Sequence, residues 1–222
     1  MRAAVAAGYG TEIDLQLSAD GEAMVFHDYA LDRLTEASGP IRQQTAETLG
    51  RTPLKGRDEG IPTLAEALTL VAGQVPLLIE FKDQDGGMGP DVGALEEAAA
   101  KHLATYRGLL AVMSFNPHSV RALARLLPQV PRGLTTSAYR PGDWHLPERT
   151  CARLRDIPDY GACGPAFISH DADDLDRPRV AELKWQGAAV LCWTIRSEAE
   201  AKAALKTAQN ITFEGYLPDL RP

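Results

Sequence analysis

Thr11-Glu12-Ile13-Asp14-Leu15-Gln16-Leu17-Ser18-Ala19-Asp20-Gly21-Glu22-Ala23-Met24-Val25-Phe26-His27-Asp28 is the stretch that decides how this chain folds. Apolar and polar residues alternate over positions 11–17, and this period of two predicts a strand. Asp20-Gly21 is a strong turn signal. A short second strand over positions 23–26 then delivers His27 and Asp28 at its end. The stretch therefore predicts a hairpin that carries two acids and a histidine.

Glu12 and Asp14 project from the same face of the predicted strand because they stand two residues apart. Two carboxylates so placed repel each other unless a cation neutralises them. A hard divalent ion such as Mg²⁺ or Ca²⁺ takes oxygen ligands and would do so. The alternative is a solvent-facing hairpin with ordinary surface acids, which the pattern as a whole disfavours.

The composition describes one soluble globular domain over residues 1–222. Hydrophobic residues make up 45% of the chain and charged residues 24%, which suits a protein with a sizeable core. The formal net charge of −7 argues against nucleic acid and anionic membranes as partners, but not against a small anionic substrate. No apolar run is long enough for a membrane span. The three cysteines are sparse, so we expect reduced thiols and a cytoplasmic location.

Strands and helices alternate along the rest of the chain, and residues 29–60 are expected to form a polar excursion outside the core. Alternation of this kind indicates a parallel sheet. No glycine-rich dinucleotide fingerprint follows a strand, so an α/β TIM (β/α)₈-type barrel is favoured over an open doubly wound sheet. The expected strands cover residues 75–82, 109–115, 132–137, 166–169, 188–194 and 211–213, and the expected helices 64–72, 91–105, 117–127, 147–156, 176–186 and 197–208.

Glu80 and Lys82 repeat the same-face spacing within an otherwise apolar strand. In such barrels the chemistry lies at the carboxyl ends of the strands. A glutamate and a lysine are costly to bury unpaired, so they form either a structural ion pair or part of a site. In the second case Glu80 is a third oxygen ligand, and Lys82 offers positive charge to an anionic substrate group.

His27 is the preferred candidate for a general acid or base, although a surface or capping role is the alternative. His118 and His170 also follow strands and are weaker candidates. Trp193 lies at a strand end, where it forms either an apolar wall for a substrate or plain core packing. Ser114 lacks a Gly-x-Ser-x-Gly elbow, which argues against a serine nucleophile.

In order and rough spacing, these motifs resemble the glycerophosphodiester phosphodiesterase family, and in particular its bacterial members. The resemblance covers essentially the whole chain and is strongest over residues 11–82. The matching segments are Glu12-Ile13-Asp14, Asp20-Gly21, Val25-Phe26-His27-Asp28, Leu31-Asp32-Arg33, Ile61-Pro62-Thr63-Leu64, Glu80-Phe81-Lys82, Ser114-Phe115 and Trp193-Thr194.

The resemblance implies a metal-dependent hydrolase that splits glycerophosphodiesters into an alcohol and sn-glycerol 3-phosphate. By motif match, Glu12, Asp14 and Glu80 resemble the family's ligands for Mg²⁺ or Ca²⁺. His27 resembles one of two catalytic histidines, and Lys82 resembles the lysine that contacts phosphate.

The chain departs from the family pattern at its beginning. The family normally opens with a strand that ends in His-Arg-Gly, followed by Glu-Asn-Thr, and neither motif occurs in this sequence. We therefore expect a barrel that lacks its first strand and most of its first helix, with impaired activity and open edges that favour a homo-oligomer. Two alternatives stay open: a non-catalytic phosphodiester-binding remnant, and a related phospholipase D-like lyase that stops at a cyclic phosphate.

Overall fold

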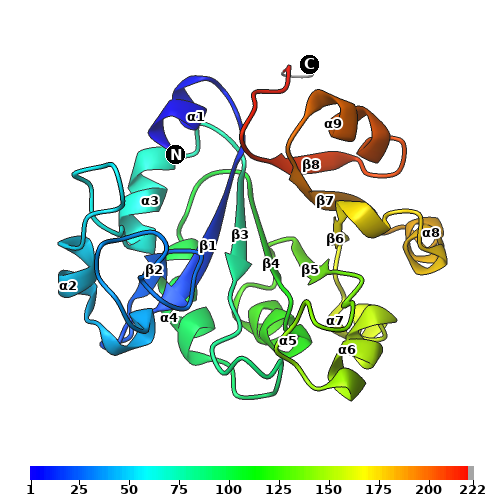
Figure 1. The fold of residues 1–222 in the computed structure, drawn as a ribbon, viewed down its shortest axis with the longest axis horizontal. Helices are drawn as coiled ribbons and strands as arrows, with labels where there is room; N and C mark the ends of the chain where they lie inside the picture. The colour runs from blue at the N-terminus through cyan, green and yellow to red at the C-terminus, as the bar shows by residue number, and fades with distance from the viewer. Residues whose placement is uncertain (220–222) are drawn as a thin grey trace.

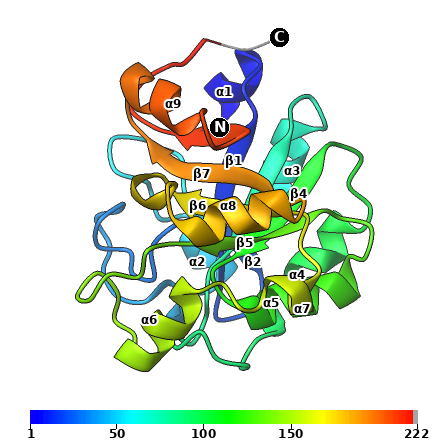
Figure 2. The same cartoon turned by 90° about the vertical axis from the view of Figure 1, so that its right-hand side faces the viewer.

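The protein folds around one curled sheet of eight strands, with helices on its outer side (Figures 1 and 2). The computed structural model describes residues 1–219. The strand order is β2-β1-β3-β4-β5-β6-β7-β8; β1 and β2 pair antiparallel and all other neighbours pair parallel. The curled sheet with its helices is a half-barrel of the TIM type, which confirms the predicted fold class. The strands are β1 (Thr11–Leu17), β2 (Ala23–Val25), β3 (Leu77–Phe81), β4 (Leu110–Ser114), β5 (Arg132–Thr136), β6 (Phe167–Asp171), β7 (Ala189–Ile195) and β8 (Asn210–Phe213).

The helices follow the predicted alternation and differ from it mainly at their ends. The short helices η1, α2, α7 and η2 were not predicted. The helices are α1 (Arg2–Ala6), η1 (Ile41–Gln43), α2 (Ala46–Gly50), α3 (Leu64–Val71), α4 (Ala94–Leu103), α5 (Pro117–Leu126), α6 (Glu148–Arg155), α7 (Tyr160–Cys163), η2 (Ala172–Asp174), α8 (Pro178–Trp185) and α9 (Glu198–Ala204). None of the helices within residues 1–219 is long and apolar enough to cross a membrane.

The alternation along β1 and β3 decides which side chains enter the interior of the curled sheet. Ile13 and Leu15 of β1, together with Ile79 of β3, are buried against the apolar faces of α3 and α4. Because successive strand residues point to opposite faces, the residues between them face the interior. The two strands pair in parallel with Asp14 opposite Glu80, so their acids share one face and one height.

Helix α3, which covers this part of the sheet, begins at a complete capping box. Thr63 Oγ1 accepts a hydrogen bond from the Glu66 amide at 3.2 Å, and the Thr63 amide donates to Glu66 Oε2 at 2.8 Å. Four apolar residues on one face of α3 are buried in the core. The cap therefore fixes where the helix starts and which face it turns to the sheet.

Residues 29–60 are not an excursion outside the core, so that prediction was wrong. They fold over β2 and build a small core of their own, in which Leu31, Ile41 and Leu49 are almost fully buried. Apolar residues in this segment are spaced irregularly, and no single period connects them. Their burial comes from packing against Met24 and Phe26, which a pattern search along the chain does not detect.

The sheet stays open, since within residues 1–219 no ladder joins β8 to β1 or to the other edge strand, β2. The two ends of the sheet meet near the start of β1 instead. There the Tyr9 hydroxyl donates to the Pro218 carbonyl at 2.7 Å, and the Tyr9 ring packs edge-on against Phe213. Figure 1 shows the amino-terminal segment and the carboxyl-terminal segment side by side at this point.

Candidate functional site

Three carboxylates converge inside the curled sheet, as the sequence predicted. Glu12 and Asp14 come from β1, and Glu80 comes from the adjacent β3. One carboxylate oxygen of each lies within 4.8 Å of those of the other two. The parallel register that places Asp14 opposite Glu80 produces this arrangement, so it follows directly from the sheet.

Lys82 is the cation that faces this cluster. It follows the last residue of β3, and its amide donates to the Leu15 carbonyl at 3.2 Å, which continues the pairing with β1. Its Nζ lies 2.7 Å from Asp14 Oδ1 and 2.6 Å from Glu80 Oε1. All three side chains are largely shielded from solvent, so the pairing acts at low local dielectric.

One ammonium group does not balance three carboxylates, and the pKa values reflect this. Burial, with the neighbouring charges of Asp14 and Glu80, raises the pKa of Glu12 from 4.5 to about 9. Burial also raises the pKa of Glu80, against the opposing charge of Lys82. Burial alone would lower the pKa of Lys82, but the two carboxylates raise it above its usual value. The cluster therefore has an excess of negative charge that a second cation would neutralise.

The donor set fits a hard divalent cation. All three groups offer carboxylate oxygens, which Mg²⁺ and Ca²⁺ prefer, and none offers the sulfur or imidazole nitrogen of a softer metal site. Both the raised pKa of Glu12 and the close approach of the oxygens follow from the same crowding. The residues present thus satisfy the chemical requirement for such an ion.

His27 lies on the loop after β2, close to the cluster. The Phe26 amide donates to the Asp14 carbonyl at 3.0 Å, and Gln16 Nε2 donates to the His27 carbonyl at 3.3 Å, so two bonds tie this loop to β1. The His27 side chain is 58% exposed, which leaves it accessible to a ligand. Its Nδ1 lies 2.6 Å from Asp28 Oδ1. His27 therefore comes directly after a backbone contact with Asp14, one of the three clustered acids.

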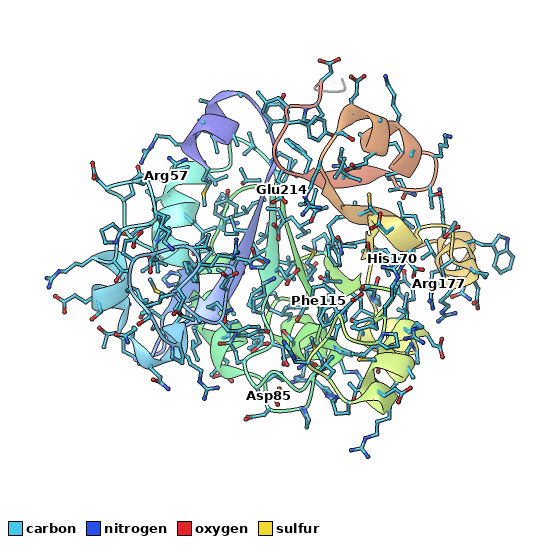
Figure 3. All side chains as sticks on the ribbon, viewed as in Figure 1. Arg57, Asp85, Phe115, His170, Arg177 and Glu214 are labelled. Atoms are coloured by element: carbon cyan, nitrogen blue, oxygen red, sulfur yellow. The ribbon has the colours of Figure 1, made fainter. Side chains whose placement is uncertain are left out.

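Trp193 belongs to an aromatic group that the sequence did not reveal. Its ring packs edge-on against Phe115, which in turn contacts Trp144 and Tyr139. Its Nε1 donates to the Ser169 carbonyl at 3.0 Å, which fixes the ring. Phe115 follows β4 and lies toward the centre of the fold (Figure 3).

One ring of the aromatic group, Tyr139, lies within electrostatic reach of the acidic cluster. Burial raises the pKa of Tyr139, and the charge of Glu80 adds to that rise, which places Tyr139 within the field of the cluster. These rings come from strand ends and loops far apart in the sequence. Only the curling of the sheet brings them together, so no local sequence signal could have found the group.

The weaker histidine candidates have other surroundings. His170 is fully buried on β6, with Nδ1 2.8 Å from Thr136 Oγ1 and Nε2 3.2 Å from Asp174 Oδ2. Figure 3 shows His170 on the side of the molecule that also carries Arg177. Arg177 Nε donates a hydrogen bond to Asp174 Oδ2, the oxygen that also contacts His170. Both ring nitrogens are thus engaged in a structural network. His118 stands in the first turn of α5.

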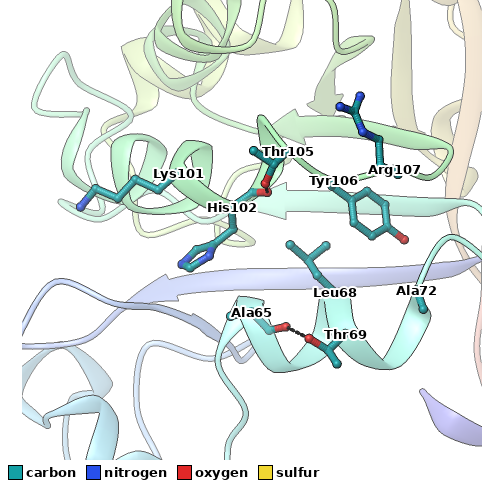
Figure 4. A pocket seen from close by; sticks show the side chains of 9 residues that line it. All are labelled: Ala65, Leu68, Thr69, Ala72, Lys101, His102, Thr105, Tyr106 and Arg107. Carbon is teal, nitrogen blue, oxygen red and sulfur yellow. Dashed lines mark hydrogen bonds between the residues drawn. The ribbon is translucent and has the colours of Figure 1, made fainter.

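A separate hollow of about 430 Å³ lies between α3 and α4, in the outer helical layer (Figure 4). Leu68 and Tyr106 contribute apolar walls, and Lys101 and His102 contribute basic groups at its edge. None of the predicted site residues lines this hollow. The chemistry-bearing residues are therefore gathered at the strand ends and not in the helical layer.

Comparison with known proteins gives this site a context. Residues 1–210 match the model of the glycerophosphoryl diester phosphodiesterase family. A glycerophosphodiester phosphodiesterase of Bacillus subtilis is 25% identical over 227 residues, covering 94% of this chain and 74% of the relative. One from Caldanaerobacter subterraneus is 29% identical over 146 residues, covering 62% of this chain and 58% of the relative. Among solved structures, a phosphodiesterase of Oleispira antarctica in complex with sn-glycerol 3-phosphate superimposes with a TM-score of 0.79 at 24% identity, covering 96% of this chain and 84% of that one.

Proposed function

Because the chain belongs to the glycerophosphoryl diester phosphodiesterase family, whose members are phosphoric diester hydrolases, we propose that it hydrolyses glycerophosphodiesters to an alcohol and sn-glycerol 3-phosphate. The observation that carries the proposal is the convergence of Glu12, Asp14 and Glu80 on one face, with Lys82 against them. A site of this charge and composition suits a phosphodiester that binds through a divalent cation and an ammonium group.

Glu12, Asp14 and Glu80 are proposed to hold Mg²⁺ or Ca²⁺. When bound, such an ion would polarise a phosphate oxygen and offset the charge that develops on phosphorus. The three carboxylates must then be ionised, so Glu12 gives up the proton that its raised pKa retains in the metal-free protein. The proposed need for a divalent cation therefore follows from the crowding of these three carboxylates.

Lys82 and His27 are proposed as the catalytic side chains. Lys82 binds the phosphate oxygens and stabilises the charge that builds up on them. Nε2 of His27 accepts the proton of the attacking hydroxyl, either water or the glycerol 2-hydroxyl, or returns a proton to the departing alcohol. The exposed side chain of His27 is consistent with a group that meets substrate from solvent.

Trp193 is proposed to bind the apolar part of the substrate. Its ring packs against Phe115 and is fixed by its hydrogen bond to Ser169, so it offers a rigid carbon surface. A glycerophosphodiester presents both an anionic phosphate and the carbon–hydrogen face of glycerol, so it matches both features. The solved relative with bound sn-glycerol 3-phosphate supports a small-molecule substrate of this kind.

The turnover of these 222 residues is proposed to be low. The resemblance implies that the histidine of the family's His-Arg-Gly motif is the second acid or base and that its arginine binds phosphate, and this sequence contains no such motif. Loss of one acid or base costs about 10²–10⁴ in rate. We expect measurable cation and phosphate binding with weak catalysis.

Release of glycerol 3-phosphate from glycerophosphocholine, measured with Mg²⁺, with Ca²⁺ and with a chelator, tests the function. We expect slow release that the chelator abolishes. Calorimetric titration of Mg²⁺ and Ca²⁺ should show one site that Asp14→Asn and Glu80→Gln weaken at least tenfold. Glu198→Gln, in an exposed pair with Lys202, is the matched control and should bind as the wild type does. Unchanged affinity in folded Asp14→Asn protein would contradict the proposed ligand set.

Three wider predictions complete the proposal. The single eight-stranded sheet supports one catalytic domain over residues 1–222. Over the described residues 1–219 the sheet has two edge strands, β2 and β8, and their unpaired edges support a homo-oligomer, which sedimentation would detect. The three cysteines are free and buried, in keeping with the predicted cytoplasmic location.

A further inference from the structure

We propose that Arg33 is a positioning residue that acts through Asp28 to hold the imidazole of His27 in one tautomer and one orientation. Arg33 Nε donates to Asp28 Oδ2 at 2.7 Å, and Arg33 Nη2 donates to Asp28 Oδ1 at 2.6 Å. Nδ1 of His27 lies 2.6 Å from the same Oδ1. The inference rests on the role proposed above for His27.

The ionisation of Asp28 decides which nitrogen of His27 carries the proton. Hydrogen bonds from Arg33 hold the pKa of Asp28 below its usual range, so its carboxylate is ionised and can only accept hydrogen bonds. Nδ1 of His27 must therefore be the donor in the 2.6 Å contact. In the neutral ring, Nε2 then keeps its lone pair and is available to accept a proton.

The two hydrogen bonds from the Arg33 guanidinium hold the Asp28 carboxylate in one orientation, and that carboxylate in turn orients His27. A carboxylate held at one oxygen still rotates about its terminal bond, whereas two parallel bonds from one guanidinium define its plane. A lysine, as a single point charge, does not reproduce this restraint. The orientation of the ring therefore depends on the guanidinium and not on positive charge alone.

Arg33 is presented from a firmly anchored segment. Leu31 is 2% exposed and is packed in the small core beneath the loop. Its amide donates to the Gly39 carbonyl at 3.0 Å, and Asp32 Oδ2 accepts the Gly39 amide at 3.1 Å. The guanidinium thus stands on a fixed base five residues after the carboxylate that it holds.

The Arg33–Asp28 pair contributes only modestly to stability. Asp28 is largely shielded at 19% exposure, but the Arg33 side chain is 63% exposed, and solvent screens a pair with one open partner. Arg51 forms a pair with Glu47 at the same N–O distance of 2.6 Å, with both side chains exposed and far from His27 in the chain. Arg51→Gln is therefore a matched control that removes an exposed arginine pair without touching the proposed machinery.

Nitrogen-15 NMR of the histidine side chains tests the proposal without relying on activity. In the wild type and in Arg51→Gln, neutral His27 should be almost entirely the tautomer protonated on Nδ1. In Arg33→Gln both tautomers should be present, and Arg33→Lys should recover the wild-type pattern only in part. An unchanged His27 tautomer in Arg33→Gln overturns the proposal.

Kinetics provide the second readout. With glycerophosphocholine, Arg33→Gln should lower kcat about tenfold and leave KM within about twofold, because substrate binding is kept while the proton-transfer group is misplaced. A tautomer shift with unchanged kcat overturns the catalytic importance of the contact. If no variant, the wild type included, shows turnover, the proposed function fails for these residues, and the tautomer alone decides whether Arg33 positions His27.

Discussion

At the scale of single residues, Glu12 shows how strongly the fold changes a side chain's chemistry. Its carboxyl group is an ordinary acid in the unfolded chain. In the folded protein, burial beside Asp14 and Glu80 raises its pKa to about 9. The group therefore keeps its proton at neutral pH until a cation replaces that proton.

This shift makes the stability of the metal-free protein depend on pH. The pKa of Glu12 is higher in the folded state than in the unfolded state, so its stabilising effect is complete below about pH 4.5 and is lost as the pH rises through about 9. Between these limits the free energy of unfolding should fall with pH by up to about 1.4 kcal/mol per unit.

Glu12→Gln should remove the contribution of Glu12 to this dependence, because glutamine does not ionise, while Glu80, whose pKa burial also raises, keeps its own contribution. Urea denaturation of both proteins at several pH values between 5 and 9, with a chelator present, measures the difference. Parallel curves for wild type and variant would show that Glu12 titrates normally. Glu22→Gln, an exposed acid in the turn before β2, is a suitable control.

At the scale of elements, two neighbouring strands fit together because one carries a large aromatic ring where the other carries a glycine. Gly133 of β5 pairs with Phe167 of β6. A Cβ on Gly133 would lie 2.2 Å from a carbon of the Phe167 ring, far inside normal contact. The glycine therefore allows two neighbouring strands to share the crowded interior.

Gly133→Ala should destabilise the protein by about 1–3 kcal/mol, since the buried ring must shift against its neighbours. Thermal unfolding followed by circular dichroism measures the effect. Gly161→Ala in α7 is the matched control, because nothing lies within 4 Å of the added carbon, and its stability should be unchanged or slightly higher. Equal stability of both variants would mean that Phe167 moves freely.

Elements with strong periodicity were predicted well, and those without it were not. The apolar faces of α3, β3 and β4 follow regular periods, and all three were predicted. Helix α2 and the core around Leu31 and Ile41 were missed, because their apolar residues become neighbours only after the segment folds over β2. Local spacing carries no record of such contacts.

At the scale of the whole molecule, the strands of the sheet differ in how many neighbouring strands they pair with. Strand β4 lies between β3 and β5, whereas β8 is paired with β7 alone within residues 1–219. Strand β8 is also more exposed than β4 along its length. A strand with one partner opens more readily than one with two.

Hydrogen exchange should therefore be faster in β8 than in β4. Mass spectrometry of peptides that cover residues 210–213 and 110–114 measures both rates in one experiment. Opening of β8 alone should precede global unfolding, with protection factors at least tenfold lower than in β4. Equal protection would show that a further strand, from another copy or another segment, covers β8.

The sequence by itself determined the alternation of strands and helices, the shared face of Glu12 and Asp14, and the matching spacing of Glu80 and Lys82. These features depend on residues close together in the chain, because the period of two along a strand decides to which face each side chain points. Only the tertiary structure decided the register that places Asp14 opposite Glu80, the aromatic group around Phe115, and the fork of Arg33 on the carboxylate beside His27. Those contacts arise when the sheet curls and the loop after β2 packs on it, because pairing energies between distant segments are realised only once the chain has closed.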